Sequence, residues 1–249
     1  MLHLIKMWLQ AAVEETDERG HQRRSTRNRD QGRGTPQGSP ISPLLSNLYM
    51  RRLVLGWKQL GHGQRLKASI VNYADDLVIC CRGRGESALA TMRDMMSKLR
   101  LTVNENKTRV CKLPQEEFDF LGYTFGRCYS PQTGRAYLGT TPSKQRVQRI
   151  CATIGQATRR SQTQQAAEAL VARLNREIIG WANYFCLGPV SKAYRAVERH
   201  TRRRLRQWLC AKHKVPGVGT KRYPDDALHE EFGLVRLAQR TASLPWATP

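Results

Sequence analysis

The sequence is short of acidic residues and has no long apolar segment. Its 249 residues include 42 Lys and Arg but only 20 Asp and Glu, so the net charge is +22. No apolar run approaches the ~18 residues needed to cross a bilayer, and we therefore expect no association with a membrane. Apolar residues still make up 40% of the chain, which is enough to form a core. The unbalanced charge predicts a polyanionic partner that relieves its self-repulsion.

Paired cysteine motifs are missing as well. The seven cysteines are scattered, and none of them forms the CxxC spacing typical of a metal site. An odd number of dispersed thiols is typical of a reducing compartment, so we expect a cytoplasmic protein. The apolar start over 1–13 has Lys6 in its middle and runs into several acids, which favours an amphipathic helix over a signal peptide.

The positive charge is concentrated in the second half of the chain. Residues 1–126 carry 20 basic and 13 acidic side chains, whereas residues 127–249 carry 22 and 7. Glycines and prolines gather where the composition changes, which predicts a hairpin or linker over 127–142. We expect an α+β fold, with a mixed domain over 1–126, an all-helical domain over 143–240 and a tail over 241–249.

Apolar spacing predicts the elements of the mixed domain. A helix over 1–13 is followed by a polar, basic loop over 19–34. Ser42 and Pro43 predict the cap and first position of a second helix, with an apolar face formed by Leu44, Leu45, Leu48, Tyr49 and Leu55. Strands are predicted over 68–71, 77–81 and 118–125, the last with an interruption at Gly122, and a third helix at Leu89, Met92, Met96 and Leu99.

Three helices are predicted in the second half. The first opens at Thr141-Pro142 and turns Val147, Ile150, Ile154 and Ala157 inward. The second runs from Ala167 to Phe185 and is ended by Gly188-Pro189, and the third has Tyr194, Val197, Leu205, Trp208 and Leu209 on its inner face. The helical spacing of Trp181, Tyr184 and Trp208 favours core packing over stacking on nucleic-acid bases.

An acidic pair lies between two short apolar strands. Asp75 and Asp76 follow Tyr73 and Ala74, so a hairpin would carry both carboxylates at its tip. Adjacent like charges repel, and a hard divalent cation such as Mg²⁺ would relieve that repulsion. An ordinary surface turn explains the pair about equally well, because Asp is common in turns. The pair Asp225-Asp226 lacks flanking strands and is interpreted as a helix cap.

A loop rich in glycine and proline precedes the second helix. Gly34 and Gly38 permit backbone shapes that let a substrate approach closely. Backbone N–H groups near a helix start favour phosphate, and Gln37 offers both a donor and an acceptor. Taken alone, the loop is equally consistent with a simple connection.

The ordered combination of motifs resembles the reverse transcriptases of group II introns and related retroelements. The resemblance is carried by the 34–43 loop, the Tyr73-Ala74-Asp75-Asp76 turn, and the segments 101–108, 118–125, 174–185, 203–209 and 212–214. It covers nearly the whole chain. It implies a partial reverse-transcriptase palm, an antiparallel sheet with helices, followed by an all-α thumb and maturase domain.

The resemblance also implies roles for individual residues. Asp75 and Asp76 would face two Mg²⁺ ions, and Lys107 would assist the departing pyrophosphate, although an ordinary solvated lysine remains the alternative for Lys107. Substrate would be bound by Pro36, Gln37, Gly38, Ser39, Tyr73 and Ala74. The primer grip would be formed by Leu121, Gly122 and Tyr123.

The basic helix of the second half has the pattern of an RNA-binding surface. The segment 199–214 holds seven Lys and Arg and no acid, so local ion pairing cannot explain its charge. Neutralised phosphates release counterions, which favours binding to RNA. The predicted RNA-binding residues are Arg199, Arg202, Arg203, Arg204, Arg206, Lys212 and Lys214.

One carboxylate expected from the resemblance has no counterpart. Such polymerases hold their metals with a third carboxylate on an earlier strand, but the aspartates that precede the loop here are only Asp17 and Asp30, both in polar stretches. We therefore expect the carboxy-terminal portion of an intron protein, with little polymerase activity alone. A polymerase part acting on dNTP and primer–template, a maturase that only binds intron RNA, and a decayed fragment all remain open. A separately encoded amino-terminal fragment would be a further partner.

Overall fold

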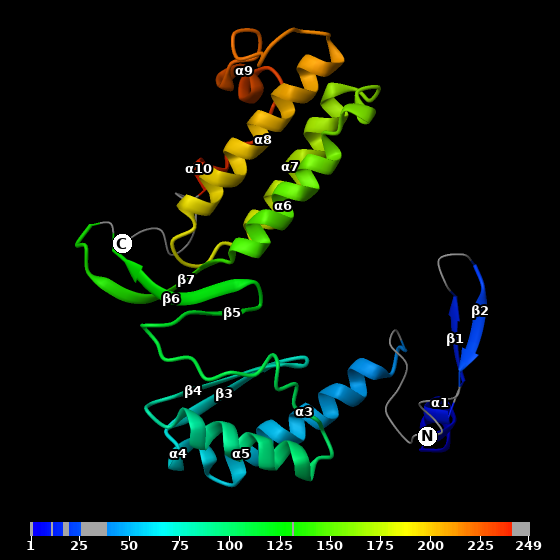
Figure 1. Ribbon diagram of the computed structural model, residues 1–249, viewed down its shortest axis with the longest axis vertical. Helices are drawn as coiled ribbons and strands as arrows, with labels where there is room; N and C mark the ends of the chain where they lie inside the picture. Colours follow the sequence, from blue (N-terminus) through cyan, green and yellow to red (C-terminus); the bar gives the residue numbers. More distant parts are fainter. Residues whose placement is uncertain (1, 11, 17–19, 26–38, 131, 241–249) are drawn as a thin grey trace. The chain divides into compact units, whose positions relative to one another are not determined.

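The computed structural model describes residues 2–10, 12–16, 20–25, 39–130 and 132–240. The chain forms two compact units, Met1–Val110 and Cys111–Pro249 (Figure 1). Helices and small antiparallel sheets occur together, as expected for an α+β protein. None of the helices in these ranges has the length and apolar character that a membrane crossing requires. All seven cysteines are free thiols.

The first unit combines helices with two hairpins. Its elements are α1 (Leu2–Gln10), β1 (Val13–Thr16), β2 (Gln22–Ser25), α3 (Ser42–Gln59), α4 (His62–Arg65), β3 (Ala68–Tyr73), β4 (Asp76–Cys81) and α5 (Gly85–Lys98). The prediction of a loop over 19–34 is wrong for residues 22–25, which form strand β2. This strand pairs with β1 and places Arg24 opposite Glu14. Opposite charges across an antiparallel pair stabilise it.

Helix α3 buries a different face from the predicted one. Met50, Leu53 and Trp57 are buried against α5 and β3, whereas Leu44 is 58% exposed and Leu48 is 50% exposed. Trp57 fixes the rotation of the helix, because its Nε1 donates to the Ala68 carbonyl at 3.4 Å. The predicted cap is also displaced by one residue.

The N-cap of α3 is Ile41, and Pro43 lies in the first turn. The first turn therefore holds a proline at its second position, where its missing N–H would have no helical acceptor. Helix α5 agrees with its predicted pattern, since Met92 is buried and Leu89, Met96 and Leu99 pack against the same cluster.

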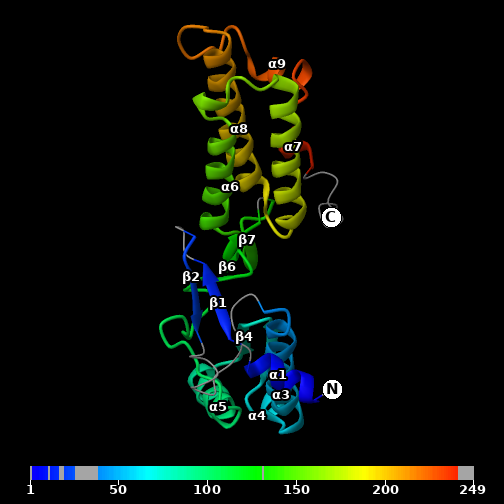
Figure 2. The same cartoon turned by 90° about the vertical axis from the view of Figure 1, so that its right-hand side faces the viewer.

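The second unit sets a three-stranded sheet beside a helical bundle (Figure 2). Its elements are β5 (Phe118–Phe120), β6 (Tyr123–Tyr129), β7 (Ala136–Pro142), α6 (Lys144–Ala157), η1 (Arg160–Gln162), α7 (Ala167–Tyr184), α8 (Ser191–Lys212), α9 (Asp225–Glu230) and α10 (Leu237–Arg240). The strands are antiparallel in the order β5-β6-β7. The glycine-rich stretch is therefore a β6–β7 hairpin and not a linker.

The sheet belongs with the bundle, so the compact units divide at Val110 and not at the residue 126 boundary expected from composition. The Ser143 N–H donates to the Gly122 carbonyl at 2.9 Å, and Tyr123 packs on Phe185 with ring centroids 5.1 Å apart. The strand pattern over 118–125 favoured grouping this segment with the mixed first half of the chain. In the structure, β5 and β6 pack on helices of the second unit instead. Helix α6 starts two residues later than predicted, with the Ser143 side chain as its cap.

The core of the second unit lies between α6, α7 and α8. The predicted inward positions are confirmed, with Ile154, Leu170, Leu174, Ile178, Tyr194, Val197, Leu205, Trp208 and Leu209 all at most 1% exposed. Core packing is confirmed for Trp208, and Trp181 packs partly buried on the cluster. The prediction of core packing is wrong for Tyr184, which is 56% exposed at the end of α7.

Candidate functional site

The β3–β4 hairpin presents the acidic pair at its apex. The strands pair from Ala68 opposite Cys81 to Tyr73 opposite Asp76, so Ala74 and Asp75 form the two-residue connection. Ala74 has a φ of 51°, a strained left-handed conformation for a residue with a Cβ. The Asn72 side chain holds the turn, because its Nδ2 donates to the Ala74 carbonyl at 2.8 Å and to the Asp76 carbonyl at 3.3 Å. The predicted hairpin tip is confirmed.

The two faces of this hairpin differ in burial. Ile70, Leu77 and Ile79 pack against the core of the first unit. The opposite face is open, with Val71 49% and Tyr73 62% exposed. Asp75 and Asp76 are exposed at the end of this face. Their oxygens are therefore free to meet a ligand from solvent.

The donor set suits a hard cation only in part. Carboxylates are acceptor-only ligands, and Mg²⁺ is commonly held by one or two of them together with water and substrate phosphate. Within the described ranges, no group of three His, Cys, Asp or Glu side chains gathers to hold a metal. The pair thus fits an ion whose remaining ligands come from elsewhere.

Residues predicted to contact substrate are described only in part. Pro36, Gln37 and Gly38 lie outside the described residues. Ser39 is half-buried just before α3, and its carbonyl accepts from the Ser42 N–H at 3.1 Å. Tyr73 and Ala74 lie on the hairpin beside the acidic pair. The relation of the glycine-proline loop to the hairpin therefore stays a prediction.

Lys107 lies exposed in a turn that follows α5. The backbone N–H of Lys107 donates to the Asn104 carbonyl at 3.1 Å. Arg93 on α5 donates to both carboxylate oxygens of Glu105, with an Nε–Oε1 distance of 3.0 Å. The hydrogen bond from Arg93 lowers the pKa of Glu105, so the pair stays charged at neutral pH. This contact ties the Lys107 turn to the helix next to it.

The turn between β5 and β6 carries the predicted primer grip. Leu121 and Gly122 both have positive φ angles, 52° and 83°, as a tight two-residue hairpin requires. The Tyr123 hydroxyl donates to the Tyr184 carbonyl at 2.5 Å, and the Tyr184 hydroxyl donates to the Leu121 carbonyl at 3.0 Å. Burial raises the pKa of Tyr123, which stays neutral and able to donate. Sequence reasoning missed the role of Tyr184, because the contact spans more than sixty residues.

Arg204 and Lys212 on α8 are bound to the protein itself. Arg204 donates to the carbonyls of Gly155 and Thr158 at 3.0 and 3.1 Å. The ammonium of Lys212 donates to the carbonyls of Thr163 and Gln165 at 3.0 and 2.8 Å. Both residues, predicted as RNA-binding, are half-buried, because their side chains satisfy carbonyls at the ends of neighbouring elements.

Two further arginines of α8 share one carboxylate on α9. Arg202 Nη1 lies 2.5 Å from Asp225 Oδ2, and Arg206 donates to the other oxygen of Asp225. Burial alone would raise the pKa of Asp225, but the hydrogen bond from Arg206 and the charge of Arg202 outweigh it and lower the pKa. Asp225 opens α9 just after its N-cap, Pro224, so the predicted cap is displaced by one residue.

The other predicted cations of this region remain available. Arg199, Arg203 and Lys214 are exposed, and none of their side chains has a hydrogen-bond or ion-pair partner among the described residues. His200 lies between Arg199 and Arg203 on α8, and its Nε2 donates to the Cys151 carbonyl at 3.0 Å. Burial lowers the pKa of His200, so this imidazole is neutral at pH 7 and adds no charge to the exposed surface.

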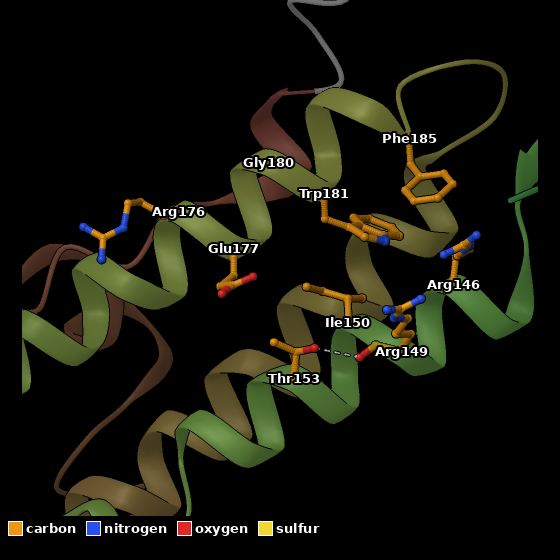
Figure 3. Close-up of a pocket in the computed structure, with 9 residues that line it drawn as sticks. All are labelled: Arg146, Arg149, Ile150, Thr153, Arg176, Glu177, Gly180, Trp181 and Phe185. Carbon is orange, nitrogen blue, oxygen red and sulfur yellow. Dashed lines mark hydrogen bonds between the residues drawn. The ribbon is translucent and has the colours of Figure 1, made fainter. Parts of the chain in front are cut away.

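A groove between α6 and α7 was not predicted from the sequence. It encloses about 330 Å³ and is lined by Arg146, Arg149, Ile150, Thr153, Arg176, Glu177, Gly180, Trp181 and Phe185 (Figure 3). The arginines come from two helices separated in the sequence by η1 and its flanking turns. A periodicity argument applied to one helix at a time cannot detect such a grouping.

Two family models match the chain. Reverse transcriptase (RNA-dependent DNA polymerase) matches residues 2–125, which include the acidic hairpin. The maturase-specific domain of group II introns matches residues 147–223, from α6 beyond the end of α8. A search of curated proteins finds no match.

Proposed function

Because the chain belongs to the reverse transcriptases and maturases of group II introns, we propose that its first unit acts in nucleotidyl transfer and its second binds intron RNA. The two matched domains imply nucleic-acid partners and a divalent metal ion. We assign the reverse-transcriptase palm to residues 1–126, which include the first compact unit and also β5 and the start of β6, the connecting hairpin to 127–142, and the thumb and maturase domain to 143–240. The observation that carries the first assignment is the acidic pair at the β3–β4 apex.

The metal is proposed to be Mg²⁺, with two ions in a complete site. Asp75 and Asp76 would hold these ions together with substrate and water, and the chemistry supplied there would be activation of a primer hydroxyl and neutralisation of charge on the phosphates of a dNTP. The rigid turn supports this role, because the Asn72 side chain fixes the backbone on both sides of Asp75. The ammonium of Lys107 would stabilise the departing pyrophosphate.

The β5–β6 turn is proposed to position the primer. Its backbone is held to α7 through Tyr123 and Tyr184, so a primer strand would meet a preformed surface. Gly122 has a φ of 83°, which disfavours any residue with a side chain, and an added Cβ would lie 2.9 Å from Nε of Arg146, which would have to shift. The turn is therefore shaped by the helices that follow it.

A second candidate is an RNA-binding maturase that assists intron folding without synthesising DNA. The specific observation in its favour is that, in the described ranges, no third acidic, His or Cys side chain joins Asp75 and Asp76. The helical unit, by contrast, has a well-packed core and exposed cations. The two candidate functions differ only in whether Asp75 and Asp76 form part of a metal site that supports DNA synthesis.

Primer extension on an RNA template with Mg²⁺ separates the candidates. We expect the 249-residue chain to synthesise little or no DNA, because two carboxylates alone hold the ions weakly. We expect the same chain to bind intron RNA in preference to arbitrary RNA at moderate salt. Robust synthesis that is abolished by Asp75→Asn would overturn the maturase-only candidate and the argument from the third carboxylate.

Complementation provides the control. If an amino-terminal fragment bearing an aspartate on a strand restores synthesis, Asp76→Asn should abolish it again, whereas Asp226→Asn in the second unit should leave it unchanged. Loss of synthesis with Asp226→Asn would mean that the assay reports folding and not chemistry. Equal binding of intron and arbitrary RNA would remove the support for the maturase role.

A further inference from the structure

The cations of the second unit fall into two sets. Arg202, Arg204, Arg206 and Lys212 are satisfied by carbonyls or by Asp225. Three arginines in the α6–α7 groove are not: the side chains of Arg146, Arg149 and Arg176 make no hydrogen bond or ion pair within the described chain. Like charges one turn apart on a helix, as at Arg146 and Arg149, are unfavourable without a partner. The groove thus gathers positively charged side chains that make no stabilising polar contact within the described chain.

Aromatic side chains line the same groove, beside Arg146 and Arg149 and at the other end from Arg176 (Figure 3). The Trp181 ring reaches from α7 toward α6, and its centroid lies 5.1 Å from that of Phe185 (Figure 3). The Nε1 of Trp181 is buried and has no hydrogen-bond partner in the described structure. Because Trp181 lines the groove and a buried donor without an acceptor is costly, a ligand that enters the groove, displaces the atoms covering this N–H and supplies an acceptor would be favoured.

The groove also adjoins the β5–β6 turn. A Cβ added to Gly122 would lie 2.9 Å from Nε of Arg146 and 3.2 Å from Cζ of Phe185. Both residues line the groove. A nucleic-acid strand lying along the β5–β6 turn would therefore have a continuous path into the groove.

We propose that the α6–α7 groove binds an unpaired segment of RNA, with backbone phosphates on Arg149 and Arg176 and a nucleotide against Trp181. Guanidinium groups bind phosphate with paired hydrogen bonds, and unpaired nucleotides stack on aromatic rings. The volume of about 330 Å³ is at the small end of the usual range for ligand sites, which suits one nucleotide better than a duplex. Glu177 is the one carboxylate in the groove, so its lining remains net positive. The assignment rests on the proposed RNA-binding function and locates it in residues that the α8 pattern does not include.

The test uses the full chain and a labelled oligouridine RNA, which has no internal pairing, in fluorescence anisotropy across a salt series. The double variant Arg149→Gln/Arg176→Gln should raise Kd at least about tenfold, since each change removes a hydrogen bond to a charged group. The slope of log K against log salt should fall by about 1.4, because each single-strand phosphate contact contributes about 0.7. Trp181→Phe, which keeps a ring but lacks the N–H, should weaken binding about threefold with an unchanged slope.

A matched control has the same change in charge away from the groove. Arg159 and Arg160 are exposed beyond the end of α6, and Arg159→Gln/Arg160→Gln should change Kd by less than about twofold. A fully paired RNA of equal length should lose little affinity in the groove variant. Equal losses in the two double variants, or equal losses for paired and unpaired RNA, would overturn the proposal.

The proposed function and this inference fail in different ways. If the unaltered chain binds no RNA, the proposed RNA-binding function fails. If the unaltered chain binds oligouridine but the groove variant keeps its Kd and its salt slope, only the groove assignment fails. Thermal unfolding of the Arg149→Gln/Arg176→Gln variant should match that of the unaltered chain, because the side chains of these two arginines make no hydrogen bond or ion pair within the described chain.

Discussion

Truncating Trp208 to alanine should lower the free energy of unfolding of the helical unit by about 3–5 kcal/mol, the usual cost of removing a buried tryptophan. Trp208 is 1% exposed in the core cluster. Its Nε1 donates to the Gln162 carbonyl at 3.3 Å, and the ammonium of Lys212 lies 5.4 Å from its ring centroid. The substitution would therefore leave a cavity and also loosen η1 and the end of α8. Urea unfolding followed by circular dichroism measures the loss.

A matched control is available in the same unit. Tyr129 on β6 is 61% exposed, so Tyr129→Ala should cost no more than about 1 kcal/mol. Trp208→Phe should fall between the two, because it retains a ring in the core. Equal destabilisation by Trp208→Ala and Tyr129→Ala would contradict the assignment of Trp208 to the core.

The second large effect concerns the exposed cations of α8. If about five phosphates are bound, RNA affinity should fall about a hundredfold between about 50 and about 200 mM salt. Neutralising Arg199 and Arg203 together should reduce the salt slope by about 1.4 without loss of stability. Arg204→Gln should leave the slope unchanged and lower the free energy of unfolding by about 1–3 kcal/mol, because the carbonyls of Gly155 and Thr158 lose their donor.

These variants distinguish cations that bind RNA from cations that hold the fold. The measurement is anisotropy with intron RNA over a salt series, combined with urea unfolding of each variant. If Arg204→Gln flattens the salt slope as much as the Arg199→Gln/Arg203→Gln double variant, then the hydrogen bonds of Arg204 do not keep it from RNA. The division of α8 into two sets would then be wrong.

The acidic hairpin was predictable because its information is local. Two apolar runs with a short polar connection define the register, which places Asp75 in the connection and Asp76 in the strand pair that closes it. The inward faces of α6, α7 and α8 were predictable for a similar reason, since period 3.6 is maintained over long helices. Leu174, Leu205 and Trp208 are buried as their spacing predicts.

The incorrect predictions arose where segments far apart in the sequence contact one another in the fold. Helix α3 has apolar residues on two faces, and its packing against α5 and β3, which includes the Trp57–Ala68 hydrogen bond, decides which face is buried. The segment 199–214 contains no acid, but Asp225 reaches it from α9 and takes up Arg202 and Arg206. The groove arginines were missed for a related reason, because Arg149 and Arg176 belong to different helices and line one groove only in the fold.

Binding of Mn²⁺, a paramagnetic substitute for Mg²⁺, to the isotopically labelled chain tests the central claim most directly. We expect the amide NMR signals of Ala74, Asp75 and Asp76 to broaden first, and the Asp75→Asn/Asp76→Asn variant to lose this broadening. The pair Asp225-Asp226 is an internal control, since Asp225 is already engaged by Arg202 and Arg206. Broadening that begins at Asp225, or that is unchanged in the double variant, would contradict a metal site at the β3–β4 apex.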